Sequence, residues 1–259
     1  MPSLANPGWF VSRARGLLVC GKVLESPICT AMLELLDSLQ SGDEAEALAR
    51  RYSIVFRLMA EEAESSTVQW PGNPWQRHLL RRLLADENPF STKVRQAGLQ
   101  SVGPSLRSAM VHDLIVLGEL CNIDPASQAS AIGNVPSWAD FRPMPDAGSL
   151  PTDEQELVGR LLRTTAWGDL VSSLADHYAR HGAGLFGQFV AFRWVQQTAG
   201  EARGARLEGI ASPDPIRLSE LVGYEGERRL LVQNTRQFVA GFPANNVLLY
   251  GDRGTGKSS

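Results

Sequence analysis

Hydrophobic residues recur at the spacing of an α-helix from residue 1 to about 200, and strand-like alternation is scarce. In the segment Ile28–Leu39, the side chains of Met32, Leu35 and Leu39 fall on one face of such a helix. The helices predicted in this way are Ile28–Leu39, Asp43–Tyr52, Ile54–Glu64 (separate, or a continuation of the helix before it), Gln76–Ala85 and Ser105–Leu120.

Residues 122–151 break this pattern, because they are rich in Pro, Ser, Ala and Gly and have no sustained period. They are predicted to form a long connector. Trp138, Phe141 and Met144 lie within it, and a disordered linker is usually poor in such groups. We therefore expect the connector to dock on the helical domain.

Two more helices are predicted after the connector. Thr152 and Gln155 have the spacing of a capping box for a helix that continues to about Thr164. The second helix covers Ala166–His181 and closes at the glycines that follow, Gly182 and Gly184.

Aromatic residues gather in the segment Leu185–Gln197. Core packing is the favoured interpretation, because large aromatic side chains bury much area; an exposed binding surface is the alternative. The residues are Phe186, Phe189, Phe192 and Trp194.

The chain is predicted to change character near residue 200. Residues 1–200 form the helical domain, residues 201–212 lack a clear period and form a linker, and a second unit covers residues 213–259. In that unit Tyr224–Ala240 is predicted to be a helix with an apolar stripe of Leu230, Leu231, Phe238 and Val239. The apolar run Val247–Tyr250 suits a short buried parallel strand.

Composition adds few constraints on partners. The chain of 259 residues is 43% hydrophobic and 20% charged, which is a globular balance, and its net charge of -3 gives no overall attraction to nucleic acid or anionic membrane. Cys20, Cys29 and Cys121 form an odd set without a CxxC pair, so neither a disulfide framework nor a zinc knuckle is indicated. We expect a cytoplasmic protein with no membrane segment.

The strongest chemical signal lies at residues 251–258, which fit the phosphate-loop pattern GxxxxGK[ST] at every fixed position. Glycines let successive N–H groups turn inward around a phosphate, Lys257 supplies a point charge to the β and γ phosphates, and the Ser258 hydroxyl suits magnesium. The candidate nucleotide-binding residues of this run are Gly251, Asp252, Arg253, Gly254, Thr255, Gly256, Lys257, Ser258 and Ser259.

Together with residues 213–224, Asn234, Thr235 and the run from Asn245 to Ser258, this motif resembles the entry to an AAA+ ATPase module. More closely, it resembles an uncharacterised bacterial family of AAA+-type ATP-binding proteins, domain of unknown function 815, in which a helical region precedes the nucleotide-binding module. The resemblance implies a mainly α chain, with a helical N-terminal domain followed by the start of an α/β P-loop NTPase module. It also implies ATP and Mg²⁺ as cofactors, and it places Leu221, Val222 and Gly223 beside the adenine. An ordinary turn at the entry to a helix is the alternative interpretation of these three residues.

The resemblance further implies that hydrolysis needs an acidic pair, a polar sensor residue and an arginine from a neighbouring subunit of a homo-oligomer. All of these are expected beyond residue 259. By the resemblance, the parent protein is expected to hydrolyse ATP and to remodel or regulate an unknown protein partner. The chain as printed is expected to do neither, because only three residues of the helix that follows the loop are present.

Other interpretations stay open or are disfavoured. Residues 1–200 alone form a protein-interaction module in the main alternative, with no role for ATP. A nucleic-acid role is not favoured, because the arginines of the predicted helix Gln76–Ala85 have no interleaved aromatic platform. His177 and His181 share a helix face as zinc ligands do, but spacing suggests no third ligand, so metal binding there is not favoured.

Overall fold

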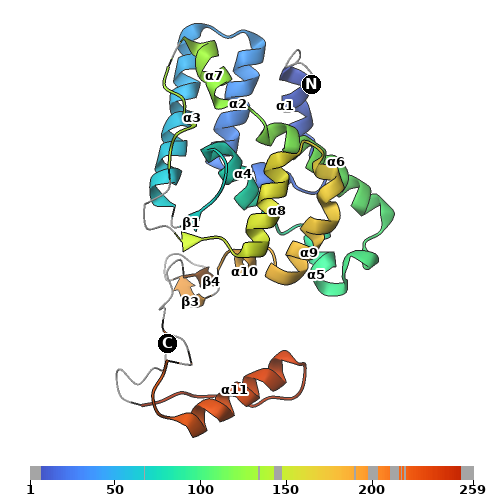
Figure 1. Ribbon diagram of the computed structural model, residues 1–259, viewed down its shortest axis with the longest axis vertical. Helices are drawn as coiled ribbons and strands as arrows, with labels where there is room; N and C mark the ends of the chain where they lie inside the picture. The colour runs from blue at the N-terminus through green and yellow to red at the C-terminus, as the bar shows by residue number, and fades with distance from the viewer. Residues whose placement is uncertain are drawn as a thin grey trace. The chain divides into compact units, whose positions relative to one another are not determined.

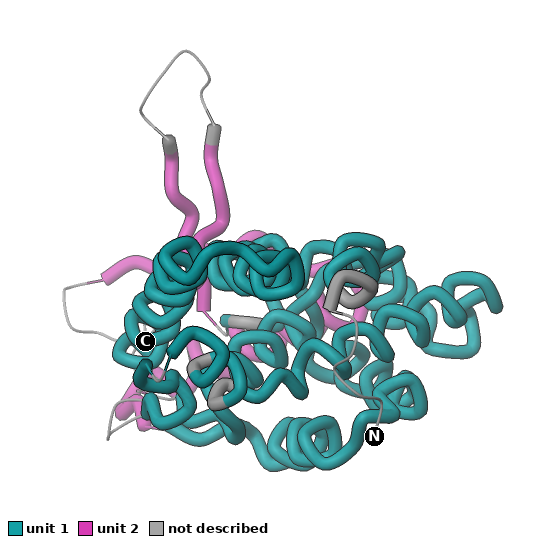
Figure 2. Tube along the Cα trace, turned by 90° about the horizontal axis from the view of Figure 1, so that it is seen from above, with its two compact units in different colours: residues 1–189 teal, residues 190–259 magenta. Residues whose placement is uncertain are grey.

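The computed structural model is mainly helical and divides into two compact units, residues 1–189 and residues 190–259 (Figure 2). The residues it describes are 7–66, 68–133, 135–142, 148–189, 191–197, 204–210, 216, 218 and 220–251. In this part of the chain no helix has both the length and the apolar character needed to cross a membrane.

The first unit is built from helices with two very short strands (Figure 1). Its helices are α1 (Pro7–Arg15), α2 (Pro27–Ser41), α3 (Ala45–Ser65), α4 (Pro74–Leu84), α5 (Pro89–Ala97), α6 (Pro104–Cys121), α7 (Pro125–Ile132), α8 (Thr152–Arg163), α9 (Val171–His181) and α10 (Leu185–Gln188). Three 3₁₀ helices, η1 (Gly21–Leu24), η2 (Leu99–Ser101) and η3 (Trp167–Leu170), lie between them. Strand β1 (Val68–Gln69) pairs in parallel with β2 (Gly148–Ser149).

Polar residues before a proline start four of these helices, α2, α4, α5 and α7. Ser26 accepts a hydrogen bond from the N–H of Cys29 at the start of α2. Asn73 and Asn88 form complete capping boxes at the starts of α4 and α5. At the start of α7, Asp124 Oδ2 accepts from the N–H of Ser127 at 3.0 Å. In each case the proline follows directly, where its missing N–H would have had no helical partner.

The capping box predicted at Thr152 and Gln155 is wrong. Pro151 takes the extended conformation of the N-cap, so Thr152 is already the first helical residue and its hydroxyl makes no capping bond. The Gln155 side chain donates instead to the carbonyl oxygen of Leu150, at 2.7 Å. In the first half of the chain, the two helices considered over residues 43–64 are one continuous helix, α3.

The core of the first unit is filled by large side chains, and two of its buried indoles donate hydrogen bonds to backbone carbonyls. The indole N–H of Trp75 donates to the carbonyl of Leu120 at 2.7 Å, and that of Trp167 donates to the carbonyl of Leu161 at 2.8 Å. The largest fully buried side chains are Trp75, Trp138, Trp167, Tyr178, Phe90, Met32, Leu35, Met59, Leu79, Leu80, Leu83 and Met110.

A buried carboxylate joins the segment after α1 to α6. Asp113 is fully buried, and its two oxygens accept hydrogen bonds from the backbone N–H groups of Leu18, Val19 and Cys20 at 3.0, 2.6 and 2.9 Å. These amides have no helical partner, so the carboxylate satisfies donors that would otherwise be costly to bury.

The connector predicted over residues 122–151 contains helix α7 and docks on the first unit, as expected. Trp138 is fully buried against Tyr52, with ring centroids 5.1 Å apart, and Phe141 packs edge-on to Phe56 at 4.9 Å. Met144 lies outside the described residues.

The second unit contains a hairpin that the sequence analysis missed. Strand β3 (Phe192–Gln197) pairs antiparallel with β4 (Gly204–Gly209), and Trp194 stands opposite Leu207. The core interpretation of the aromatic group is wrong for Phe186, in the first unit, and for Trp194, because they are 58% and 67% exposed. For Trp194 the reason is that a two-stranded hairpin has no second layer of its own on which the side chain could be buried.

Candidate functional site

Helix α11 (Glu225–Val239) is the element that supports the predicted nucleotide-binding segments. The chain enters it through two left-handed residues, Gly223 at φ 83° and Tyr224 at φ 58°. Glycine adopts this backbone conformation without strain, whereas a residue with a large side chain, such as Tyr224, rarely does. Glu225 and Glu227 in the first turn suit the positive end of the helix dipole.

Arg228 fixes the segment that precedes α11. Its Nη1 donates to the carbonyl oxygens of Leu218 at 2.8 Å and Leu221 at 2.6 Å. Leu221 is followed by Val222 and Gly223, and sequence analysis assigned all three residues to the adenine side. The Val222 side chain is 94% exposed, so this edge of the segment is open to a ligand.

Asn234 fixes the segment that leads toward the phosphate loop. Its Nδ2 donates to the carbonyl of Asn245 at 2.9 Å, while its Oδ1 accepts from the N–H of Asn245 at 2.9 Å. This pair of bonds satisfies both backbone groups of Asn245, much as a neighbouring strand would. The sequence analysis noted both asparagines only as part of the resemblance, and their spacing alone did not reveal the contact.

The strand predicted at Val247–Tyr250 is not present, since these residues have no ladder partner and are assigned no regular structure. All of their side chains are exposed. An extended segment needs neighbouring strands to satisfy its backbone and cover its apolar side chains, and none pairs with this one in the described part of the chain. Three members of the apolar stripe of α11, Leu230, Phe238 and Val239, are exposed for the same reason, because no layer among the described residues covers them; Leu231 is half-buried.

Gly251 opens the predicted phosphate loop with a φ of 148°, a value that glycine takes more easily than other residues. The rest of the predicted loop lies outside the described residues: Asp252, Arg253, Gly254, Thr255, Gly256, Lys257, Ser258 and Ser259. Hydrogen bonds from α11 thus hold both the backbone just before Val222 and Gly223 and the segment that leads to Gly251.

A largely buried Ser–His–Glu triplet, which the sequence did not predict, occurs in the first unit. The Ser26 hydroxyl lies 2.9 Å from His78 Nε2, and His78 Nδ1 lies 2.6 Å from Glu62 Oε2. Nucleophile, base and orienting carboxylate share this order in hydrolases. Here, however, the Ser26 hydroxyl is buried and caps α2, so we assign the triplet a structural role.

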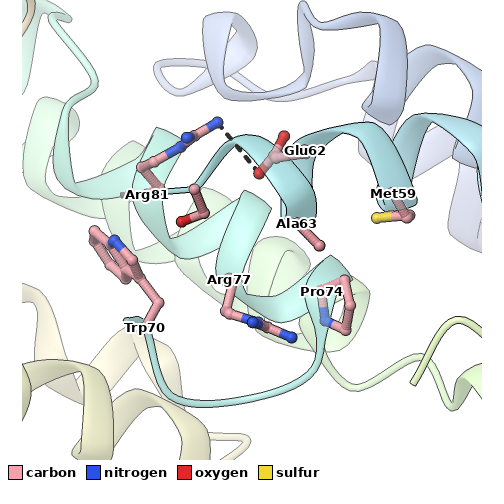
Figure 3. Close-up of a pocket in the computed structure, with 8 residues that line it drawn as sticks. Met59, Glu62, Ala63, Trp70, Pro74, Arg77 and Arg81 are labelled. Atoms are coloured by element: carbon pink, nitrogen blue, oxygen red, sulfur yellow. Dashed lines mark ion pairs between the residues drawn. The ribbon is translucent and has the colours of Figure 1, made fainter. Parts of the chain in front are cut away.

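The hollow beside Glu62 is also too small for a substrate. It is lined by Met59, Glu62, Ala63, Ser66, Trp70, Pro74, Arg77 and Arg81, and Glu62 pairs with Arg81 across it at 3.2 Å (Figure 3). Its volume of about 20 Å³ holds roughly one water molecule.

The arginines of α4 are held within the first unit. Arg77 donates to the carbonyl of Phe141, Arg81 pairs with Glu62, and Arg82 donates to carbonyls of η1 and its end. Each of the three guanidinium groups therefore has a partner within the first unit, while the Arg81 side chain remains 48% exposed.

The histidine pair lies on one face of α9, as its spacing indicated, with ring centroids 4.9 Å apart. Burial lowers the pKa of His177 to about 4. A third group with a ligand atom, Glu154, comes from α8. Spacing within one helix could not identify it, because it depends on how two helices pack.

Residues 187–259 match the model of one family, described as "Protein of unknown function (DUF815)". This match supports a relationship of the second unit and the residues just before it to an uncharacterised family. No curated protein and no solved structure matches the chain.

Proposed function

We propose that residues 213–259 form the beginning of an AAA+-type module, and that the longer protein to which the chain contributes binds and hydrolyses ATP. The observation that carries this proposal is the run Gly251–Ser258, which fits the phosphate-loop pattern at every fixed position. It directly follows the apolar residues Val247–Tyr250, the type of segment that feeds such a loop.

The groups in this run fit a magnesium nucleotide. The Lys257 ammonium suits the β and γ phosphates, the Ser258 hydroxyl suits the ion, and the glycines leave backbone N–H groups free to face an anion. Bound Mg²⁺ would neutralise charge on the phosphate oxygens. Val222 and Gly223 would contact the adenine.

The contacts of α11 support this arrangement. Arg228 holds the carbonyl of Leu221, beside the adenine-side residues, and Asn234 holds the backbone of Asn245, at the approach to the loop. Both anchors belong to one helix, and a rigid element positions a site more precisely than loops do.

The helical unit is proposed to recognise the protein partner that ATP turnover remodels or regulates. Hydrolysis itself would need an acidic pair, a sensor residue and a neighbouring subunit's arginine, and we place these beyond residue 259.

The proposal is tested on a protein that extends past Ser259 into the downstream coding sequence. Calorimetry with ATP and Mg²⁺ measures binding, and phosphate release measures turnover. Lys257→Ala should weaken binding at least tenfold, about 1.4 kcal/mol, and abolish turnover. Lys93→Ala, which removes an exposed lysine from α5, should leave both unchanged. Turnover by Lys257→Ala at the unmutated rate would refute the proposal.

A further inference from the structure

Two helices of the first unit bring three metal-ligating side chains together. Glu154 lies in the first turn of α8, while His177 and His181 lie in the last turns of α9, which packs beside α8 (Figure 1). Glu154 Oε1 is 3.9 Å from His177 Nδ1 and 3.6 Å from His181 Nδ1. All three ligand atoms lie within 4.8 Å of one another.

The outer contacts fix which ring nitrogens face the centre of this cluster. His177 Nε2 lies 3.2 Å from the carbonyl oxygen of Leu84, an acceptor, so this nitrogen carries the hydrogen. His181 Nε2 lies 2.6 Å from Asp153 Oδ2 and donates in the same way. In the neutral rings both Nδ1 lone pairs therefore point toward the Glu154 carboxylate oxygen, with no hydrogen between them.

We propose that Glu154, His177 and His181 bind a divalent transition-metal ion, with Zn²⁺ as the best fit. Two imidazole nitrogens and one carboxylate oxygen form a donor set that zinc prefers, with metal–ligand distances of about 2.0–2.2 Å. In a tetrahedral site such ligands lie about 3.4 Å apart, so the three atoms need to close by only a fraction of an ångström to about 1.4 Å. The cation places positive charge where three electron-rich atoms converge.

The surroundings match those of zinc sites in other respects. Metal-bound histidines usually donate their second N–H to a carboxylate or a backbone carbonyl, and Asp153 and Leu84 provide one of each. The His181 and Asp153 side chains are 26% and 38% exposed, so a fourth ligand from solvent can reach the ion. Three protein ligands and one open position are typical of zinc sites that bind a water or substrate.

Helix dipoles offer a competing explanation, because they also favour carboxylates in a first turn and histidines in a last turn. In that case a protonated His181 pairs with Asp153 and Glu154, and no metal binds. The helix-dipole explanation accounts for the partly exposed His181. It does not account for His177, whose Nδ1 also faces Glu154 although its side chain is only 6% exposed.

The test uses the full chain, without a histidine tag, freed of metal by chelation and titrated with Zn²⁺ alone in a calorimeter. One ion per chain should bind. His181→Ala removes one ligand and Glu154→Gln replaces the carboxylate ligand by a neutral amide, so each should weaken binding more than about 100-fold. Asp153→Asn removes the negative charge of an outer partner and should weaken binding by about 10–100-fold. His112→Ala is the matched control, because it removes an exposed histidine outside the cluster, and it should bind as the unmutated chain does.

Circular dichroism of each variant checks that the fold is retained; the partly exposed positions of His181 and Glu154 were chosen for this reason. Absence of saturable Zn²⁺ binding, or unchanged affinity in both His181→Ala and Glu154→Gln, would overturn the site. Unchanged affinity in Asp153→Asn would overturn the role of Asp153.

Discussion

Gly118 lies on the buried face of α6, against the indole ring of Trp167 in the 3₁₀ helix that leads into α9. A Cβ atom added at Gly118 would stand 2.8 Å from Trp167 Cγ and 3.1 Å from two other ring atoms. Carbon atoms normally approach to about 3.5–4.0 Å, so Gly118→Ala would force a shift of about 0.7 Å. Trp167 cannot move outward easily, because it is fully buried and its ring N–H is bonded to Leu161.

Two opposing effects set the magnitude. Alanine is more favourable than glycine inside a helix by about 0.8–1 kcal/mol. Overpacking a closed core costs about 1–3 kcal/mol, and the fixed indole places this site in the upper half of that range. We therefore expect Gly118→Ala to lower the free energy of unfolding by about 1–2 kcal/mol.

Urea denaturation followed by circular dichroism measures this change, with Gly159→Ala as the control. At Gly159 the added Cβ would meet only the far end of the Arg163 side chain, at 3.1 Å, and that side chain can move. This variant should gain about 0.5–1 kcal/mol. If both variants were stabilised alike, the close packing of α6 on Trp167 would be refuted.

Three further predictions concern thiols, acid stability and the nucleotide segment. Burial raises the pKa of Cys29 to about 11 and that of Cys121 to about 12, and also raises that of Cys20, so none should react with a thiol reagent at pH 8 until the chain is unfolded; rapid labelling in native buffer would contradict this. Burial alone would raise the pKa of the Glu62 carboxyl. The hydrogen bond and charge of His78 and the charges of Arg81 and Arg82 outweigh burial, so the pKa lies below its usual value. The ionised Glu62 carboxylate therefore contributes stability above its pKa in the unfolded chain, and this contribution is lost as the pH falls through its pKa in the folded chain. Unfolding free energies measured from pH 7 to pH 3 should fall more steeply in the unmutated chain than in Glu62→Gln. Parallel profiles would refute this contribution of Glu62. Asn234→Ala, in a protein extended past residue 259, should weaken ATP binding several-fold in calorimetry without abolishing it, and unchanged affinity would argue against the anchoring role.

The parts of the fold that sequence predicted well are those with a strong local signal. Helices α2, α4 and α6 carry apolar residues at a regular spacing, and the structure has them within a few residues of the predicted bounds. The error at Thr152 was one residue in register, because both Pro151 and Thr152 suit a helix start and the backbone of Pro151 decides. The hairpin of β3 and β4 had a visible signal, the alternation of Phe192 and Trp194, but aromatic clustering was read as core packing.

The candidate sites show a different limit. The phosphate-loop pattern is a run of consecutive residues, so the sequence shows it directly. The contacts of Arg228 with Leu221 and of Asn234 with Asn245 each depend on how the chain turns at one end of α11, which the sequence pattern does not show. For a related reason, the sequence could not identify Glu154 as the third member of the histidine cluster. Its carboxylate meets the two histidines only because the start of α8 packs against the end of α9, and periodicity along either helix does not encode that meeting.

The bonds from Asp113 have a consequence for synthesis on the ribosome. The amides of Leu18, Val19 and Cys20 leave the ribosome first, and their acceptor follows 93 to 95 positions later. At about 5–20 residues per second, the wait lasts roughly 5–20 s. During that interval these three amides lack their native acceptor, so this part of the core can be completed only after Asp113 has emerged.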